Sequence, residues 1–261
     1  TASRADVRDS AGLAGVLAGH AAVVSAVPYR FSLEVTRAAL RARVNLCDLG
    51  GNTAIVRAQL RLSAQARRAG ISIVPDCGLA PGMANVLARL AVRRLEARGA
   101  RPERVRIFCG GLPLHPRPPL DYQLVFSIEG LLNEYLGAAQ YLRDGRLVKV
   151  PTLTEVEAVV FPQPVGRCEA FVTSGGLSLL PWSMRGKLKT LEYKTVRYPG
   201  HCEKVRLLRD LGLLDDAPVR VRGAEVIPQE VAAAALTPRL TFRHSPDLVV
   251  LRVEGEGRLK G

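Results

Sequence analysis

The amino-acid sequence predicts an α/β fold in which a parallel sheet covered by helices is followed by a mixed α+β domain. Three observations support this prediction. Short apolar strands alternate with helical stretches over the first eighty residues, which is typical of a parallel sheet. After Pro81 the sequence changes to short strands separated by Gly and Pro. The length of 261 residues, with 48% hydrophobic residues, is enough for two domains of ordinary size.

The first eighty residues contain three predicted strands. The continuous apolar run AAVVSAV, residues 21–27, has the length of a strand, and a segment of helical periodicity follows it. The second strand is Val44–Asp48 and the third is Ile71–Asp76. Between them we expect one helix over residues 53–69, because Gly70 is a typical residue just after a helix. This alternation of strands and helices forms a doubly wound fragment.

The boundary to the second domain is expected near Leu79–Met83. A long helix begins at Pro81, since proline favours the first helical turn, and ends at Gly99. Further helices are expected around residues 131–135 and 203–211, and we identify no closing element in the tail 247–261. Short strands are predicted in VRIFCGGLP, YQLVFSIEG, RLVKVP, EAVVFP, CEAFVTSGG, LKTLEYKTVRYPG and DLVVLRVEGEG.

Composition excludes several classes of protein. The net charge is +13, but Lys and Arg are dispersed along helical segments, so we expect no nucleic-acid partner. No stretch approaches the roughly 18 apolar residues that span a bilayer, and the first residues do not resemble a secretory signal. We therefore expect no membrane association and a cytoplasmic location. The five cysteines and four histidines are irregularly spaced, which predicts reduced thiols and no metal site.

A GxGxxG turn, which binds the pyrophosphate of dinucleotides in doubly wound folds, does not occur in the sequence. The chain also begins without Met, inside a helix-forming segment. We therefore expect one or two further strand-helix units, of roughly 30 residues each, before this chain in the complete protein.

Five segments together resemble a known family. They occur in the expected order between about Asp6 and Arg252, and they resemble the saccharopine dehydrogenase-like family, most closely its L-lysine 6-dehydrogenase branch. The segments are VPYRFSLEVTRAALRARVNLCDLGGN, DCGLAPGMANVLA, GGLPLHPRPPLDYQLVFSIEGLLNEY, EAFVTSGGLS and LEYKTVRYPGHCEKVRLL.

The resemblance implies two domains. Residues 1–80 would form a partial Rossmann dinucleotide-binding domain whose glycine-rich unit is absent, and residues 81–261 an α+β catalytic, substrate-binding and dimerisation domain. It also implies NAD or NADP as cofactor, a small-molecule amino-acid substrate and a homodimer. The missing N-terminal turn and C-terminal segment put cofactor binding by this polypeptide in question.

The carboxyl ends of the three predicted strands supply the candidate cofactor-binding residues, because open parallel sheets bind ligands there. Ordinary turns or a helix cap are the alternative explanation, and for Cys77 we favour a buried thiol over a nucleophile. The candidates are Val27, Pro28, Asp48, Gly50, Gly51, Gly78, Pro81, Gly82 and Met83.

The candidate catalytic residues centre on YKTVRYPGH. We expect a strand over residues 192–198, with Arg197 as anchor of the substrate carboxylate, Lys194 as its polar support and His201 as a proton-transfer group titrating near neutrality. A solvated edge strand is the alternative, since Lys and Arg often lie on edges.

Other polar residues complete the candidate site. Thr173 and Ser174 offer hydroxyls to a carboxylate or cofactor amide, and Asp48 is expected to hold a substrate ammonium or to orient the cofactor amide. Glu129 and Glu134 are either amine partners or solvated helix-start carboxylates.

Three functions remain open. The first is NAD(P)-dependent oxidative deamination of L-lysine at the 6-position. The second is saccharopine dehydrogenation, which requires several converging Arg side chains because saccharopine has three carboxylates. The third is a non-catalytic homologue or fragment that lacks cofactor binding.

Overall fold

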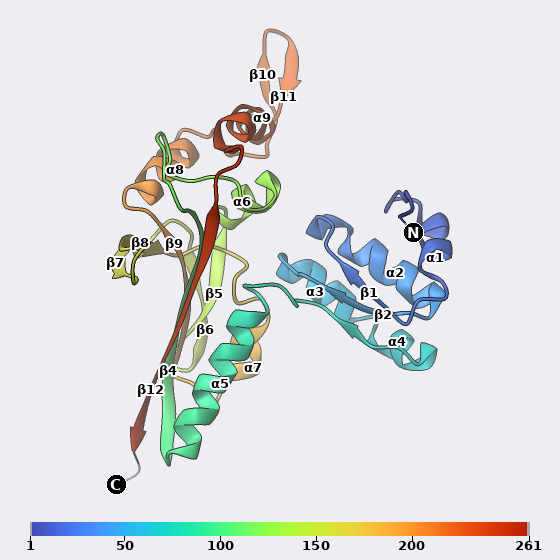
Figure 1. Cartoon of the computed structure of the whole chain (residues 1–261), viewed down its shortest axis with the longest axis horizontal. Helices are drawn as coiled ribbons and strands as arrows, with labels where there is room; N and C mark the ends of the chain where they lie inside the picture. Colours follow the sequence, from blue (N-terminus) through green and yellow to red (C-terminus); the bar gives the residue numbers. More distant parts are fainter. Residues whose placement is uncertain (1, 260–261) are drawn as a thin grey trace. The chain divides into compact units, whose positions relative to one another are not determined.

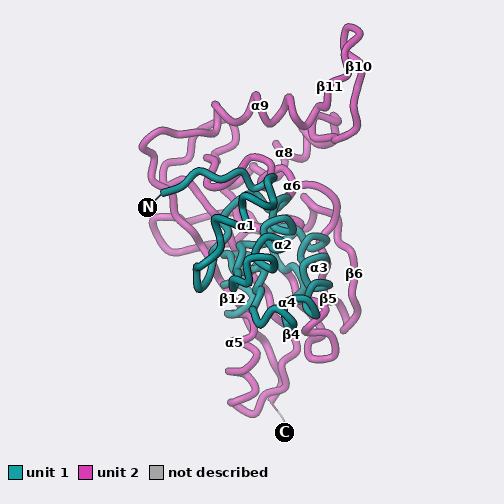
Figure 2. Tube along the Cα trace, turned by 90° about the vertical axis from the view of Figure 1, so that its right-hand side faces the viewer, with its two compact units in different colours: residues 1–87, 175–180 teal, residues 88–174, 181–261 magenta. Residues whose placement is uncertain are grey.

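A computed structural model describes residues 2–259 and confirms the predicted α/β class, with a parallel sheet followed by a mixed sheet (Figure 1). Contacts divide the chain into two units (Figure 2). The first unit contains the residues up to Leu87 together with Gly175–Leu180, and the second contains Ala88–Ser174 and the residues from Pro181 onward.

The first unit is built on a three-stranded parallel sheet in the order β1-β2-β3. Apolar side chains such as Leu13, Val35, Ala38 and Leu46 form its core, in which helices pack against the sheet. The elements are α1 (Ser10–Leu17), β1 (Ala22–Ser25), the 3-10 helix η1 (Tyr29–Phe31), α2 (Ser32–Ala42), β2 (Asn45–Asp48), α3 (Thr53–Leu60), α4 (Ser63–Ala69) and β3 (Ile73–Val74).

The single helix predicted over residues 53–69 is in fact two helices, so this prediction is wrong in detail. The chain turns between α3 and α4, where the hydroxyl of Ser63 donates to the carbonyl of Leu60 at 2.5 Å and the backbone N–H of Leu62 donates to Gln59. Local hydroxyl bonds of this kind compete with helical ones. The predicted end at Gly70 is confirmed, since Gly70 follows α4 with a φ of +72°.

The second unit contains a seven-stranded sheet in the order β12-β4-β9-β5-β6, with β8 paired to β9 and β7 to β8. Strands β4 and β9 are parallel, and the other pairs are antiparallel. The strands are β4 (Ala100–Pro113), β5 (Ala138–Arg143), β6 (Arg146–Pro151), β7 (Glu157–Val160), β8 (Arg167–Phe171), β9 (Thr190–Arg197) and β12 (Asp247–Leu259).

Helices cover this sheet and its upper end in Figure 1. The long helix α5 lies beside β4 and β12, so that a Cβ added at Gly255 would lie 3.3 Å from the side chain of Ala91. Buried side chains, including Tyr122, Tyr135 and Phe171, form a core with α6, α8 and α9. The remaining elements are α5 (Met83–Ala97), α6 (Ile128–Glu134), α7 (Leu180–Met184), α8 (His201–Asp210), the hairpin β10 (Val219–Val221) and β11 (Ala224–Val226), and α9 (Pro228–Leu240).

Two further predictions need correction. The segment YQLVF forms no strand: Tyr122 and Gln123 are buried, and Leu124 donates its backbone N–H to Leu240 at the end of α9 instead of to a sheet. The tail does contain a closing element, because β12 pairs with β4 along its whole length.

Within residues 2–259, all five cysteines are free thiols, and Cys77 is exposed, contrary to the buried thiol we expected. The same residues contain no cluster of three His, Cys, Asp or Glu side chains suited to a metal ion. None of their helices is long and apolar enough to span a lipid bilayer.

Candidate functional site

Strand β9 carries polar side chains into the interior of the second unit. It lies between β4 on one side and β5 and β8 on the other, so the edge-strand interpretation of YKTVRYPGH is wrong. Thr195 is 1% exposed and Arg197 2%. After the strand, Gly200 adopts a φ of +88° and precedes α8, so that the buried His201 opens this helix. Polar groups at these depths require partners.

Arg197 finds most of its partners within the protein. Its Nη1 donates to the carbonyl of Val196 at 3.0 Å, and its Nη2 donates to Oε2 of Glu134 at 3.4 Å. The guanidinium carbon lies 4.6 Å from the ring centre of Tyr122, a cation–π distance. Only Nε is without a partner among the described residues. The position therefore fits a buried charge paired with Glu134 better than the substrate anchor that we predicted.

Glu134 is the last residue of α6, and its side chain is 25% exposed. Desolvation raises the pKa of this carboxyl to about 7, although the charge of Arg197 acts in the opposite direction. A carboxyl group that titrates near neutrality exchanges protons readily at physiological pH. Of the two candidate carboxylates, Glu129 and Glu134, it is Glu134 that has a contact with Arg197.

His201 does not titrate near neutrality, which corrects our prediction. Burial, together with the charge of Arg197, lowers its pKa to about 3. Its Nδ1 lies 2.9 Å from the carbonyl of Leu120, which can only accept a hydrogen bond, so Nδ1 carries the proton. Its Nε2 lies 2.8 Å from the hydroxyl of Tyr135, which is then the donor. His201 thus acts as a neutral group that orients Tyr135.

The segment beginning at Thr173 lies against the same network. The hydroxyl of Thr173 lies 2.6 Å from that of Thr195, and Ser174 donates its N–H to the backbone carbonyl of Glu134 at 2.9 Å. The hydroxyl of Ser174 donates to the carbonyl of Asn133 at 2.8 Å. Of these two predicted catalytic residues, Ser174 therefore contacts Glu134, and Thr173 contacts Thr195 on β9.

Lys194 has its own partners, apart from those of Arg197. Its ammonium group contacts Glu157 at 2.6 Å and donates to the carbonyl of Glu155 at 2.6 Å. Since alternate side chains of a strand point to opposite faces, Lys194 and Arg197 belong to different faces of β9. Lys194 is a member of a separate ion-pair group in the sheet.

Asp48, in the first unit, faces inward and not toward a ligand, so its predicted role also needs correction. Asp48 is 1% exposed. Its carboxylate accepts from the N–H of Gly50 at 2.8 Å and from the side-chain amide of Gln59 at 2.5 Å. That amide also donates to the hydroxyl of Thr36 at 2.9 Å. Asp48 therefore holds the turn that follows β2, which is the alternative role we considered for it.

The predictions missed Asp76, which follows β3. Its φ is +63°, and a Cβ added at Gly50 would collide with its carboxylate. Burial, to which the charge of Asp48 adds, raises its pKa. A non-glycine residue in this backbone region is a pointer to function. Ligands of open parallel sheets bind at the carboxyl ends of the strands. Asp76 is the last residue of the third predicted strand, so the same argument would have identified it.

The predicted cofactor-binding residues Gly78, Pro81 and Gly82 lie in a close-packed turn between β3 and α5. A Cβ at Gly82 would collide with the carbonyl of Gly78, and a Cβ at Gly78 would lie 2.6 Å from the carbonyl of Leu49. Met83 begins α5 with 56% of its surface exposed. Glycine at these positions lets the backbone of this turn pack closely on itself and on the carbonyl of Leu49. Cofactor binding by Gly78, Pro81, Gly82 and Met83 stays a prediction.

The other predicted cofactor-binding residues follow β1 and β2. Pro28 is exposed and precedes η1, whereas Val27 packs partly against the core of the unit. Gly50 and Gly51 have φ values of +72° and +117°, which glycine adopts without strain.

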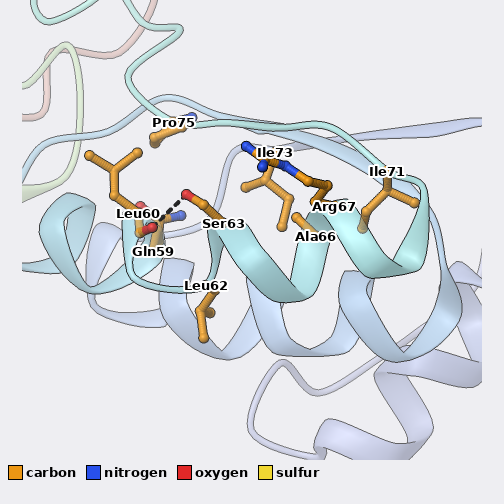
Figure 3. A pocket seen from close by; sticks show the side chains of 9 residues that line it. All are labelled: Gln59, Leu60, Leu62, Ser63, Ala66, Arg67, Ile71, Ile73 and Pro75. Carbon is orange, nitrogen blue, oxygen red and sulfur yellow. Dashed lines mark hydrogen bonds between the residues drawn. The ribbon is translucent and has the colours of Figure 1, made fainter.

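A pocket of about 300 Å³ lies beside α3, α4 and β3 (Figure 3). None of the predicted site residues lines it. Gln59, which contacts Asp48, is the link between the pocket and the turn after β2. Its lining residues are Gln59, Leu60, Leu62, Ser63, Ala66, Arg67, Ile71, Ile73 and Pro75.

Comparison with known proteins gives two family matches in tandem. Residues 1–74 match the saccharopine dehydrogenase NADP binding domain, and residues 78–261 match the saccharopine dehydrogenase C-terminal domain.

Individual relatives agree with these matches. Saccharopine dehydrogenase (NADP(+), L-glutamate-forming) of Pyricularia oryzae is 28% identical over 216 residues, which are 81% of this chain and 47% of the relative. Mitochondrial alpha-aminoadipic semialdehyde synthase of Mus musculus is 29% identical over 74% of this chain and 21% of the relative. The chain thus spans about half the length of the fungal enzyme.

One solved structure has the same fold. The apo saccharopine dehydrogenase (L-Glu forming) of Saccharomyces cerevisiae superposes with a TM-score of 0.72 at 22% identity, over 95% of this chain and 69% of that one.

Proposed function

This chain belongs to the saccharopine dehydrogenase family, and on that premise we propose that it acts as an NAD(P)-dependent oxidoreductase on the C–N bond of an amino acid. The proposed substrate is L-lysine, which loses its 6-amino group as ammonia after oxidation. The observation that carries the proposal is the order of the two family matches, a dinucleotide-binding domain followed by its C-terminal domain.

The first unit is the proposed cofactor-binding part. The oxidised nicotinamide, when bound, supplies the hydride acceptor. We assign its binding to the partly exposed backbone of Gly50, Gly51, Gly78 and Gly82, with Pro81, Val27, Pro28 and Met83 beside them. Support comes from Gly78 and Gly82, whose lack of a side chain keeps the turn after β3 packed against the turn after β2.

Charge in the second unit favours lysine over saccharopine. Four cations of the sheet already have carboxylate partners: Arg106 and Lys194 pair with Glu157, Arg143 with Glu155, and Arg197 with Glu134. A substrate with three carboxylates requires several uncompensated cations, whereas lysine has one carboxylate and two ammonium groups. The partly exposed Glu134 also attracts a cationic substrate.

Saccharopine is the second candidate substrate. The fungal relatives are named as saccharopine dehydrogenases, and they are 28% identical to this chain. The reaction class is the same for both substrates, since each loses hydride from a carbon that bears nitrogen.

Calorimetric titration with NAD and NADP tests the proposal on protein expressed from its complete coding sequence. We expect at least one dinucleotide to bind. Gly82→Ala should weaken binding at least tenfold because its methyl group collides with the Gly78 carbonyl, whereas Gly15→Ala has open space around its Cβ and should bind normally. Binding of neither dinucleotide by the wild type would leave the non-catalytic homologue as the remaining interpretation.

A further inference from the structure

Glu134 and Arg197 are unequally accessible partners. The two side chains are 3.4 Å apart, yet that of Glu134 is 25% exposed and that of Arg197 only 2%. A buried guanidinium is compensated best by a carboxylate that is buried with it. Glu134 instead is the partly exposed member of the pair.

The other titratable groups that face Glu134 are neutral at physiological pH. They are Tyr122 from the loop after β4, Tyr135 from the end of α6, Tyr193 from β9 and Cys109 from β4. Burial raises the pKa of all four, to about 12 for Cys109 and Tyr135. His201, which contacts Tyr135, is neutral as well. Among these residues only Glu134 changes its charge near pH 7.

We propose that Glu134 is the base that removes a proton from the substrate's ammonium group before the neighbouring carbon is oxidised. This inference rests on the proposed function, because it assigns a role within that reaction. In the proton transfer an N–H bond breaks, an O–H bond forms on the carboxylate and the nitrogen keeps the electron pair. The products are a neutral amine and a protonated Glu134, and no oxidant is consumed in this step.

The surroundings suit Glu134 to this role. A free ε-ammonium has a pKa of about 10.4, and a base that titrates near 7 accepts its proton more readily than an ordinary carboxylate does. Arg197 positions the carboxylate and keeps a useful fraction of it ionised. Ser174 fixes the end of α6 through the backbone carbonyl of Glu134.

Steady-state kinetics with lysine over a range of pH test the proposal. In the wild type, kcat/KM should fall about tenfold per pH unit below about pH 7 and stay level from there to about pH 10. In Glu134→Gln, kcat/KM should be about 100-fold lower at pH 8. It should go on rising with pH instead of levelling off, because only the free amine then reacts. Glu96→Gln, at the exposed C-terminal end of α5, is the matched control and should behave like the wild type.

Carbon-13 NMR of the glutamate carboxyl groups provides a second measurement that does not depend on turnover. One signal should titrate near pH 7, be absent in Glu134→Gln and persist in Glu96→Gln. If Glu134→Gln does not fold, Glu134→Asp is measured instead. Its kcat/KM should be lower than that of the wild type but should still fall at acid pH. A folded Glu134→Gln with wild-type kinetics would overturn this inference alone, whereas a wild type that oxidises neither lysine nor saccharopine would overturn the proposed function as well.

Discussion

His201 contributes a pH dependence to stability, because its pKa falls to about 3 on folding from an ordinary value near 6.5. Between these values the unfolded chain binds more protons than the folded one, so the free energy of unfolding should rise with pH across this window. His201→Gln should flatten this rise, while His115→Gln, at an exposed position, should leave it intact. Urea melting at pH 4 and pH 7 measures the difference, and a rise of wild-type size in His201→Gln would contradict the assignment.

Substitution of Arg197 distinguishes two possible roles of this residue, positioning of Glu134 and anchoring of the substrate carboxylate. If it positions Glu134, Arg197→Ala should move the acid limb of kcat/KM to higher pH, since the charge that lowers the Glu134 pKa is lost. If it anchors the substrate carboxylate, as the sequence predicted, KM should rise at least tenfold without any movement of the limb. We expect the moved limb, a smaller movement in Arg197→Lys, which keeps the charge, and none in the exposed control Arg68→Ala.

Residue types could be predicted from the sequence better than residue roles. Arg197 and Ser174 were identified from their chemistry, and the structure brings both to Glu134, while Thr173 contacts Thr195. Their roles depend on burial and on partners far along the chain, which spacing does not reveal. For the same reason the inward orientation of Asp48 was not predictable, since it depends on Gln59.

At the scale of elements, the pairing of β4 with β9 is the feature that places Arg197. Gly110 lies on β4 where a Cβ would collide with the carbonyl of Val196. Gly110→Ala should therefore destabilise the second unit by about 1–3 kcal/mol, the usual cost of overpacking. Gly15→Ala, in a helix with open space, should stabilise the first unit by up to about 1 kcal/mol. Thermal melting compares them, and an undiminished melting temperature in Gly110→Ala would contradict the β4–β9 register.

Elements with a clear period were predictable, and elements fixed by distant pairing were not. The three strands of the first eighty residues, the helix after Pro81 and β9 were predicted within a few residues of their bounds, whereas the break between α3 and α4 was missed. The full length of β12 was not, because it depends on β4, more than a hundred residues earlier. The segment YQLVF was wrongly predicted as a strand, because its apolar residues are buried in a core that includes residues of α9.

At the scale of the whole molecule, the sequence contained enough to identify the family, whose two domain models match in tandem. The substrate could not be predicted from the sequence, because it depends on how many Arg and Lys side chains of the second unit lack a carboxylate partner. The ion pairs of Arg106, Arg143, Lys194 and Arg197 became visible only in the folded sheet. The lysine branch therefore stays a prediction that needs a chemical test.

The most direct test of the central claim is the formation of reduced nicotinamide, followed by its absorbance, with lysine and saccharopine compared side by side. Protein expressed from the complete coding sequence is supplied with NAD or NADP at alkaline pH. We predict lysine-dependent reduction of the cofactor with release of ammonia, and a much smaller rate with saccharopine. Reduction with saccharopine but not with lysine would contradict the assigned substrate, and no reduction with either would contradict the assigned activity.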